Sequence, residues 1–136
     1  TTAIRAAFPG HEIVPGQYFS EGHAYPFFEV YHDTSQDPLF RIEPDWKLGQ
    51  IRIVSTRHPS VKGPSGETIG AYRLSDLNQH EQKTCSEGQN ENSGSLVCIQ
   101  QTANTQFQYI FGPIQDGQNA VLIKMSYLPV SKSVTD

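Results

Sequence analysis

Cys85 and Cys98 are the residues of this chain best suited to covalent or metal chemistry, and they close the stretch CSEGQNENSGSLVC. Zinc sites use paired Cys-x-x-Cys spacings or two cysteines with two histidines, whereas these cysteines stand thirteen positions apart with only His80 nearby. A redox pair would also need Cys-x-x-Cys, and a nucleophilic cysteine needs a base that the spacing does not reveal. A disulfide fits better, because the loop can turn at Asn-Ser-Gly before a strand begins at Ser95. Such a bridge indicates an oxidising compartment.

Two other loops have a composition that suggests ligand binding. Residues 87–94 are rich in oxygen ligands but lack the Asp ladder and closing Glu of an EF-hand, so a solvated loop is favoured over a calcium site. Residues 62–70 have the glycines of a phosphate loop, but no Lys-Ser or Lys-Thr follows the second glycine. Pro64 and Gly66 instead fit the second and fourth positions of a type I turn. We therefore predict no metal and no cofactor.

Glu43, Asp45 and His58 are the residues from which a small hydrolase would be built. Acid and base carboxylates need an opposed geometry, which a single hairpin around Pro44 seldom provides. The sequence contains no G-x-S-x-G, H-E-x-x-H or Ser-Lys signature. We favour a protein that is not an enzyme, and the hydrolase stays an alternative.

The segment from Ser55 to Ser65 gathers Arg57, His58 and Lys62 in a chain that is acidic overall. Loops carry function more often than cores do, and these cations could meet an acidic partner. An ordinary solvated connection is the competing interpretation. Arg57, His58 and Lys62 are the candidate partner-binding loop.

The stretch from Gln17 to His32 contains six aromatic residues and two histidines. It could form a sugar-stacking or metal-binding surface. Strands filled with Phe and Tyr are more often core and cross-strand pairs, so we favour a structural role.

Short alternating runs predict the antiparallel strands that must position these residues. The predicted runs are 27–31, 39–42, 50–54, 95–100, 106–111 and 120–127, with a further strand near 69–74. The first ten residues predict a short helix that ends at Pro9 and docks through Ile4 and Phe8. Ser75 is expected to cap a second helix that continues to about Lys83. The predicted fold class is α+β, an antiparallel sheet of about six to seven short strands with one or two short helices packed on one face.

The clearest predicted hairpin covers residues 39–53, with the connection Pro-Asp-Trp-Lys-Leu-Gly at 44–49. Alternation puts Arg41 on the wet face of its first strand. The same alternation puts Arg52 on the wet face of the second strand and turns Ile51 and Ile53 to the core.

The length, composition and net charge of the chain limit the class of protein to which it can belong. A chain of 136 residues with 36% hydrophobic and 18% charged residues predicts a single domain over residues 1–128, followed by a polar tail at 129–136. A net charge of −4 without runs of Lys or Arg argues against nucleic acid as a partner. No stretch approaches the roughly 18 apolar residues of a membrane span. Because the chain begins Thr-Thr-Ala, we expect that a signal peptide or lipid-anchored linker preceded it, and that any membrane contact is made through that anchor.

Several short motifs occur in one order along the chain. They are IRAAFPG at 4–10, YPFF at 25–28, GQIRIV at 49–54, GETIG at 66–70, Cys85, SLVC at 95–98 and FQYIF at 107–111. This order resembles a family of small bacterial envelope lipoproteins of unknown function that is linked in enterobacteria to the envelope-stress response. The resemblance implies a lipid-anchored periplasmic domain with its two cysteines bridged. It offers no catalytic residue, and the lipidated cysteine is not in this chain.

These observations favour a non-enzymatic periplasmic or envelope binding domain whose partner is a protein or a cell-wall component. The expected location is the periplasm, with or without an outer-membrane anchor, or outside the cell. The alternative is a periplasmic inhibitor of a lysozyme-like cell-wall hydrolase. Such enzymes are cationic with acidic clefts, which a loop such as Arg57 to Lys62 or Asn92 to Ser95 could enter.

Overall fold

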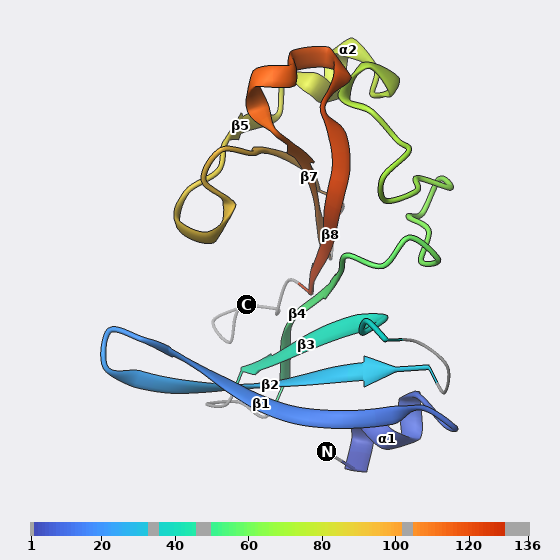
Figure 1. Cartoon of the computed structure of the whole chain (residues 1–136), viewed down its shortest axis with the longest axis vertical. Coiled ribbons are helices and arrows are strands. Elements are labelled where there is room, and N and C mark those ends of the chain that lie inside the picture. Colours follow the sequence, from blue (N-terminus) through green and yellow to red (C-terminus); the bar gives the residue numbers. More distant parts are fainter. Residues whose placement is uncertain (1, 33–35, 46–49, 102–104, 130–136) are drawn as a thin grey trace, which may run out of the picture.

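The computed structural model forms one antiparallel sheet of eight strands in the order β1-β2-β3-β4-β8-β7-β6-β5 (Figure 1). It describes residues 2–32, 36–45, 50–101 and 105–129. The strands are β1 (Glu12–Ser20), β2 (His23–Tyr31), β3 (Phe40–Asp45), β4 (Gln50–Thr56), β5 (Cys85–Glu87), β6 (Leu96–Gln101), β7 (Thr105–Gly112) and β8 (Val121–Pro129). Residues 46–49 of the predicted connection and residues 130–136 of the predicted tail lie outside the described residues.

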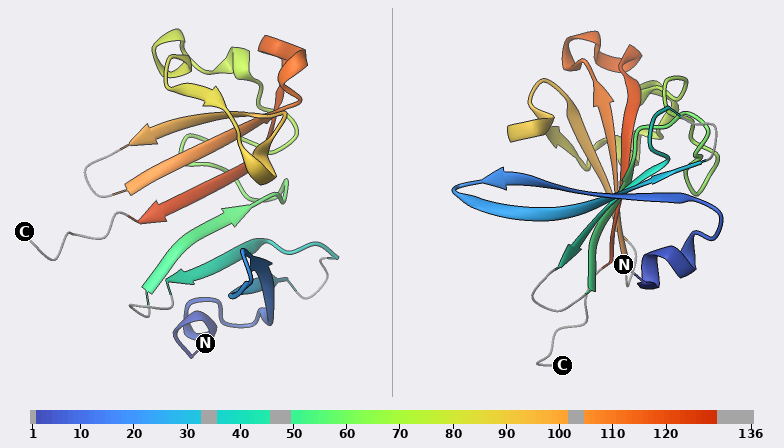
Figure 2. Two further views of the ribbon diagram at one scale, coloured as in Figure 1. Left: turned by 90° about the vertical axis from the view of Figure 1, so that its left-hand side faces the viewer. Right: turned by 60° about the horizontal axis from the view of Figure 1, so that its bottom comes forward.

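Two meanders of four strands make up the sheet. Within each meander, strands that follow one another in the sequence pair with each other. Among the described strands, the two meanders are joined by the pairing of β4 with β8, through Val54 with Tyr127, Ser55 with Ser126 and Thr56 with Met125. Figure 2 shows the strands fanned about a common axis, so that the two meanders are turned steeply against one another. Such accumulated twist is the usual consequence of the right-handed twist of each strand.

The fold is mostly β, with more strands than the α+β prediction of six to seven. The two strands that the sequence did not reveal are β1 and β5. β1 contains Pro15 and Gly16, which weaken a strand pattern but are tolerated at the edge of a sheet, where β1 lies. β5 has only three residues. The strand predicted near 69–74 is absent, and Arg73 instead forms an isolated bridge with Val121.

Helix α1 (Thr2–Ala7) forms where the sequence predicted it. Ile4 is buried with Val30 and Ile42, and Phe8 packs against the same cluster. Gly10 follows with φ of 78°, a conformation that glycine adopts without steric cost. Helix α1 therefore covers the meander of β1 to β4.

The second predicted helix is broken into two short pieces, so the prediction of one helix capped by Ser75 was wrong. A 3-10 turn, η1 (Leu74–Asp76), is followed by Leu77 in an extended conformation with ψ of 142°. Helix α2 (Gln79–Gln82) then begins, and the side chain of Asn78 caps it by accepting a hydrogen bond from Glu81 N at 2.8 Å.

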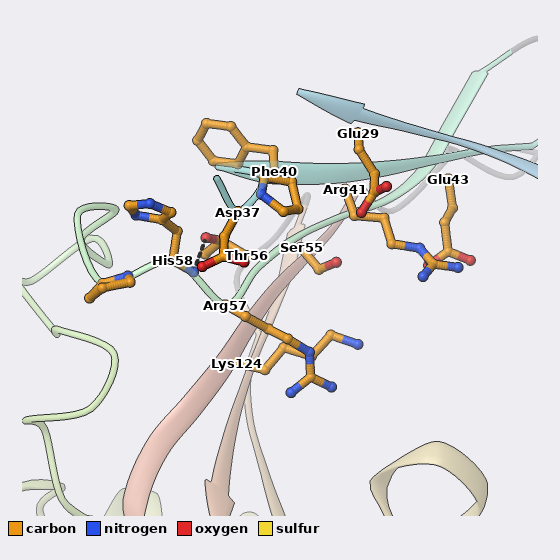
Figure 3. A pocket seen from close by; sticks show the side chains of 12 residues that line it. Glu29, Asp37, Phe40, Arg41, Glu43, Ser55, Thr56, Arg57, His58 and Lys124 are labelled. Atoms are coloured by element: carbon orange, nitrogen blue, oxygen red, sulfur yellow. Dashed lines mark hydrogen bonds and ion pairs between the residues drawn. The ribbon is translucent and has the colours of Figure 1, made fainter. Parts of the chain in front are cut away.

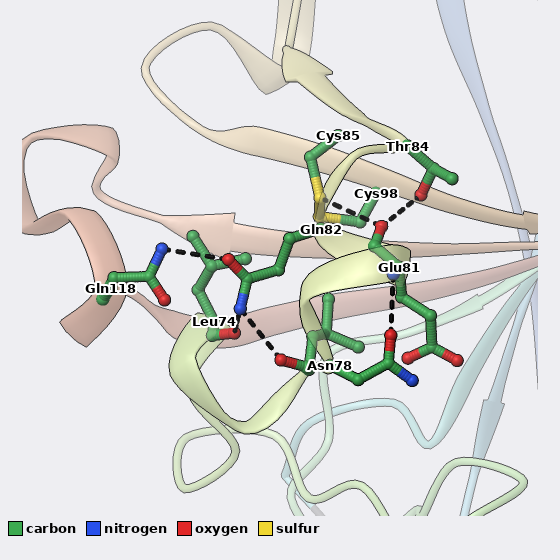
Figure 4. Close-up of a disulfide and its surroundings, with 9 residues drawn as sticks. Leu74, Asn78, Glu81, Gln82, Thr84, Cys85, Cys98 and Gln118 are labelled. Atoms are coloured by element: carbon green, nitrogen blue, oxygen red, sulfur yellow. Dashed lines mark hydrogen bonds between the residues drawn. A yellow bond between two sulfur atoms is a disulfide. The ribbon is translucent and has the colours of Figure 1, made fainter.

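Gln82 ties these short elements together (Figure 4). Its Nε2 donates to the carbonyl oxygens of Leu74 and Leu77, at 3.1 and 2.8 Å. Its Oε1 accepts from Gln118 in the 3-10 segment η3 (Ile114–Asn119). A third 3-10 turn, η2 (Asn90–Asn92), lies in the loop between the cysteines.

A second buried cluster covers the meander of β5 to β8, and it lies on the same face of the sheet as the first. It consists of Ile69, Leu74, Leu77, Cys98, Tyr109, Phe111, Ala120, Leu122 and Met125. The register row Val54, Tyr127 and Phe107 runs from one cluster to the other. We call the face that carries this row the inner face and the opposite face the outer face. Within the described residues, no helix is long and apolar enough to cross a membrane.

The predicted disulfide is confirmed. Cys85 and Cys98 are register partners of β5 and β6, and their Cα atoms lie 3.9 Å apart. Cys98 is buried in the second cluster. The bridge fixes the three-residue edge strand to the rest of the sheet (Figure 4).

We expect the Cys85→Ala/Cys98→Ala double variant to lose about 3 kcal/mol of unfolding free energy, because a bridged loop of this length restricts the unfolded chain. Urea denaturation of the unreduced proteins measures the loss. Ser86→Ala, an exposed change between the same strands, is the matched control and should stay close to wild type. A double variant as stable as Ser86→Ala would contradict the account.

Tyr109 is a buried ionisable group of the second cluster, with an exposed fraction of 3%. Its hydroxyl donates to Gln100 Oε1 at 3.3 Å. Burial, and then the nearby Glu67, raises the pKa of Tyr109 above its ordinary value. Because the folded pKa is raised above the unfolded one, the stability from neutral Tyr109 is full below about pH 10 and is lost as pH rises toward the folded pKa.

The free energy of unfolding should therefore fall above about pH 10, and it should fall less steeply in Tyr109→Phe. Urea denaturation at several pH values between about pH 8 and pH 11 measures both slopes. A residual slope is expected from other tyrosines whose pKa is also raised by burial, namely Tyr18, Tyr31 and Tyr72. Equal slopes for the variant and wild type would refute the role of Tyr109.

Candidate functional site

One row of polar side chains crosses the outer face from β2 to β7. Each member is the register partner of the next, in the order Glu29, Arg41, Ser55, Ser126 and Gln108. Side chains alternate between the faces along each strand, so the apolar neighbours of these residues turn to the inner face. Ser55 and Ser126 sit where the two meanders join, and both are buried, at 4% and 5% exposed.

A cavity of about 370 Å³ lies beside this row (Figure 3). Three carboxylates and three permanent cations line it, together with Ser55 and His58. The charged residues are Glu29, Asp37, Glu43, Arg41, Arg57 and Lys124. In Figure 3 the side chains of Arg57 and Lys124 project to the same side of the sheet, beyond Ser55. The cavity therefore presents both signs of charge to a ligand.

Glu43 is held by two arginines. Arg52 Nη2 lies 2.9 Å from Glu43 Oε1, and Arg41 Nε lies 3.8 Å from Oε2. Arg52 also donates to the hydroxyl of Tyr18 at 3.4 Å. The side chain of Glu43 is only 12% exposed, so this carboxylate acts as the centre of a structural ion-pair network.

Arg41 is held in place by aromatic rings of the β1–β2 hairpin. Its Cζ lies 4.0 Å from the ring centroid of Phe27 and 5.4 Å from that of Tyr18, which is a cation–π geometry. The Phe27 ring packs directly on Gly16, where an added Cβ would lie 2.5 Å from a ring carbon. Among the described residues, Arg41 Nε has no hydrogen-bond partner although it is buried. The aromatic stretch therefore has a structural role, because its rings position Arg41 in the wall of the cavity.

The cavity brings together two of the three residues of the predicted partner-binding loop. Arg57 and His58 line it, whereas Lys62 lines a separate pocket on the inner face. His58 Nδ1 accepts a hydrogen bond from Ser60 N at 3.1 Å and lies 2.7 Å from Ser60 Oγ. The backbone N–H of His58 donates to Thr56 Oγ1 at 3.1 Å. These contacts fix the loop against the end of β4.

The geometry of this cavity gives little support to the hydrolase alternative. Glu43 and His58 line the same cavity but lie at opposite ends of it in Figure 3, and the side chain of Asp45 lies outside the described part of the chain. Glu43 is engaged by Arg52 and His58 by Ser60, so the two do not form an acid and base pair. No group of three or more potential metal ligands occurs among the described residues.

Sequence reasoning missed Glu29, Asp37 and Lys124 as members of the site. Alternation could place Glu29 on the wet face of its strand, as it did for Arg41. Lys124 joins them only because β8 lies beside β4, a pairing between strands far apart in sequence.

Comparisons with known proteins find a solved structure with a similar fold. The structure is similar to the crystal structure of the uncharacterized protein yfeY from Escherichia coli, with a TM-score of 0.70 and 19% sequence identity. The similarity covers 93% of this chain and 86% of that one. No protein-family model matches the chain, and the comparison with curated proteins finds no match. The chain thus shares its fold with a bacterial protein of unknown function, while the lipid anchor and the link to envelope stress stay predictions.

Glu43→Ala should lower the unfolding free energy by about 1 to 2 kcal/mol, because it leaves the buried Nε of Arg41 without a nearby carboxylate. Urea denaturation near neutral pH provides the measurement. Glu12→Ala removes an exposed carboxylate from β1 and serves as the control, with a change within about 0.5 kcal/mol. If both variants match wild type, the ion-pair network does not support the site.

Proposed function

We propose that this chain is a non-enzymatic binding domain of the bacterial envelope and that its ligand occupies the cavity on the outer face. The observation that carries the proposal is the cavity of about 370 Å³, which is lined by opposite charges on adjacent strands. Its volume falls within the range of roughly 300–1,000 Å³ of small-molecule sites. Its walls come from strands and a fixed loop, so the site exists before the ligand arrives.

The charges favour a ligand that itself carries both signs, and a peptide of the bacterial cell wall has that chemistry. Its free carboxylates match the guanidinium of Arg57, which can bind a carboxylate through two parallel hydrogen bonds. Its amino group matches the carboxylate of Glu29. Ser55, between these two groups in the cavity, offers a hydroxyl that can donate or accept. This ligand is the cell-wall form of the partner that the sequence suggested.

The disulfide supports the proposed compartment, because such bridges persist mainly in oxidising environments. A periplasmic location, an outer-membrane anchor preceding Thr1 and secretion are all consistent with that chemistry. The similarity to a bacterial protein also supports the choice of the envelope over other oxidising compartments.

Titration with the soluble wall tripeptide L-alanyl-γ-D-glutamyl-meso-diaminopimelate should give saturable amide shifts at Ser55 and Arg57 in NMR spectra. Charge reversal by Arg57→Glu should weaken binding about tenfold or more, because it removes the bidentate contact and repels the carboxylate. Arg5→Glu reverses an exposed charge in the last turn of α1, away from the cavity, and should leave the affinity unchanged. Absence of saturable shifts, or equal affinities for the two variants, would rule out this ligand.

The hydrolase inhibitor stays an alternative, and the same variants separate it from the proposal. An inhibitor that uses the Arg57 to Lys62 loop would block lysozyme in a turbidity assay and lose that effect in Arg57→Glu. A binding domain for wall peptides shows no such inhibition. Arg57 and His58 line a concave site, which suits the receiving of a ligand better than insertion into another protein's cleft.

A further inference from the structure

The inner face carries a second, apolar pocket between the two covers of the sheet. Helix α1 covers one cluster and the segment of residues 69–77 covers the other. Between them lies a pocket of about 310 Å³. The residues that define it include Val54, Val61, Lys62, Phe107, Met125 and Tyr127. Apolar side chains from both meanders therefore face an opening that neither cover fills.

The wall that carries Lys62 is fixed by short-range contacts. Lys62 forms an isolated bridge with Thr68, and Gly63 N donates to Glu67 O at 2.8 Å. Gly66 N donates to Gly63 O at 3.0 Å, which confirms the turn predicted at Pro64.

Gly63 packs closely on β8. A Cβ added at Gly63 would lie 3.0 Å from Met125 Sδ and 2.5 Å from Glu67 Oε1. The buried carboxylate of Glu67 accepts from Ser65 N at 2.9 Å and does not line the pocket. Among the described residues that line this pocket, Lys62 is the charged one, and it is exposed to solvent.

We propose that this pocket binds the chain of a free fatty acid of medium length, with its carboxylate beside Lys62. The apolar lining suits an aliphatic chain, which gains free energy when it leaves water. The volume lies at the small end of ligand sites, which suits one short chain and not the two chains of a phospholipid. The lysine at the side of the pocket complements an anionic head group. This site has a different chemistry from the polar cavity, and the proposal does not depend on a wall peptide binding there.

Octanoate and 1-octanol provide the test, because they have chains of equal length and differ in the charge of the head group. Both should give saturable shifts at Val54, Phe107 and Tyr127 in NMR titrations. Lys62→Gln should weaken octanoate about threefold to fivefold, as expected for an exposed ion pair, and leave octanol unchanged. Val61→Trp replaces a small side chain with an indole ring that fills the pocket, and it should abolish binding of both ligands.

Arg57→Gln is the matched control, because it removes a cation from the polar cavity and not from this pocket. It should leave octanoate binding unchanged. The proposal fails if neither ligand saturates at millimolar concentration, or if Arg57→Gln weakens octanoate as much as Lys62→Gln does. A lysophospholipid that binds more tightly than octanoate would overturn the assignment to a free acid. Amide spectra that overlay away from the pocket show that each variant is folded.

Discussion

The pairing of β4 with β8 is the constraint on which the rest of this structure depends. Three residue pairs join two meanders that are otherwise built from neighbouring strands. The junction makes one sheet with a common inner face, and it brings Ser55 beside Ser126 on the outer face. Both pockets include Ser55 and Thr56, so the same short ladder supplies a wall to each. This ladder of three residue pairs is short, and each meander has its own buried cluster.

The two faces at the junction differ because the side chains alternate. On the inner face Val54 and Tyr127 continue the apolar row between the clusters. On the outer face long charged side chains stand around two small serines, which leaves room for a ligand. The Arg41 and Glu43 network, supported by the aromatic hairpin, holds one side of that space. A binding site therefore arises where strand order, alternation and side-chain size coincide.

Local patterns predicted much of the fold, and long-range pairing explains most of what they missed. Residue spacing and turn residues predicted the bridge of Cys85 and Cys98 and the helix that contains Ile4. They also predicted strands β2 to β4 and β6 to β8. The predicted alternation failed in β4: Val54 lies on the inner face, so Ile53, which pairs with Glu43, lies on the outer face. A register shift after that pair leaves Ile51 opposite Pro44 and 42% exposed. A bulge of this kind changes which face the next residues occupy, and it has no clear mark in the sequence.

The site was harder to predict than the fold, because its charges come from four separate parts of the chain. Arg57 and His58 were found as polar residues of one loop, but Lys124 joins them through the β4–β8 pair alone. Intermolecular nuclear Overhauser effects between a bound wall peptide and the protein test whether the peptide occupies the cavity on the outer face. We expect contacts from the peptide to the side chains of Ser55, Arg57 and Lys124. Contacts confined to the β1–β2 hairpin or to the loop between the cysteines would contradict it.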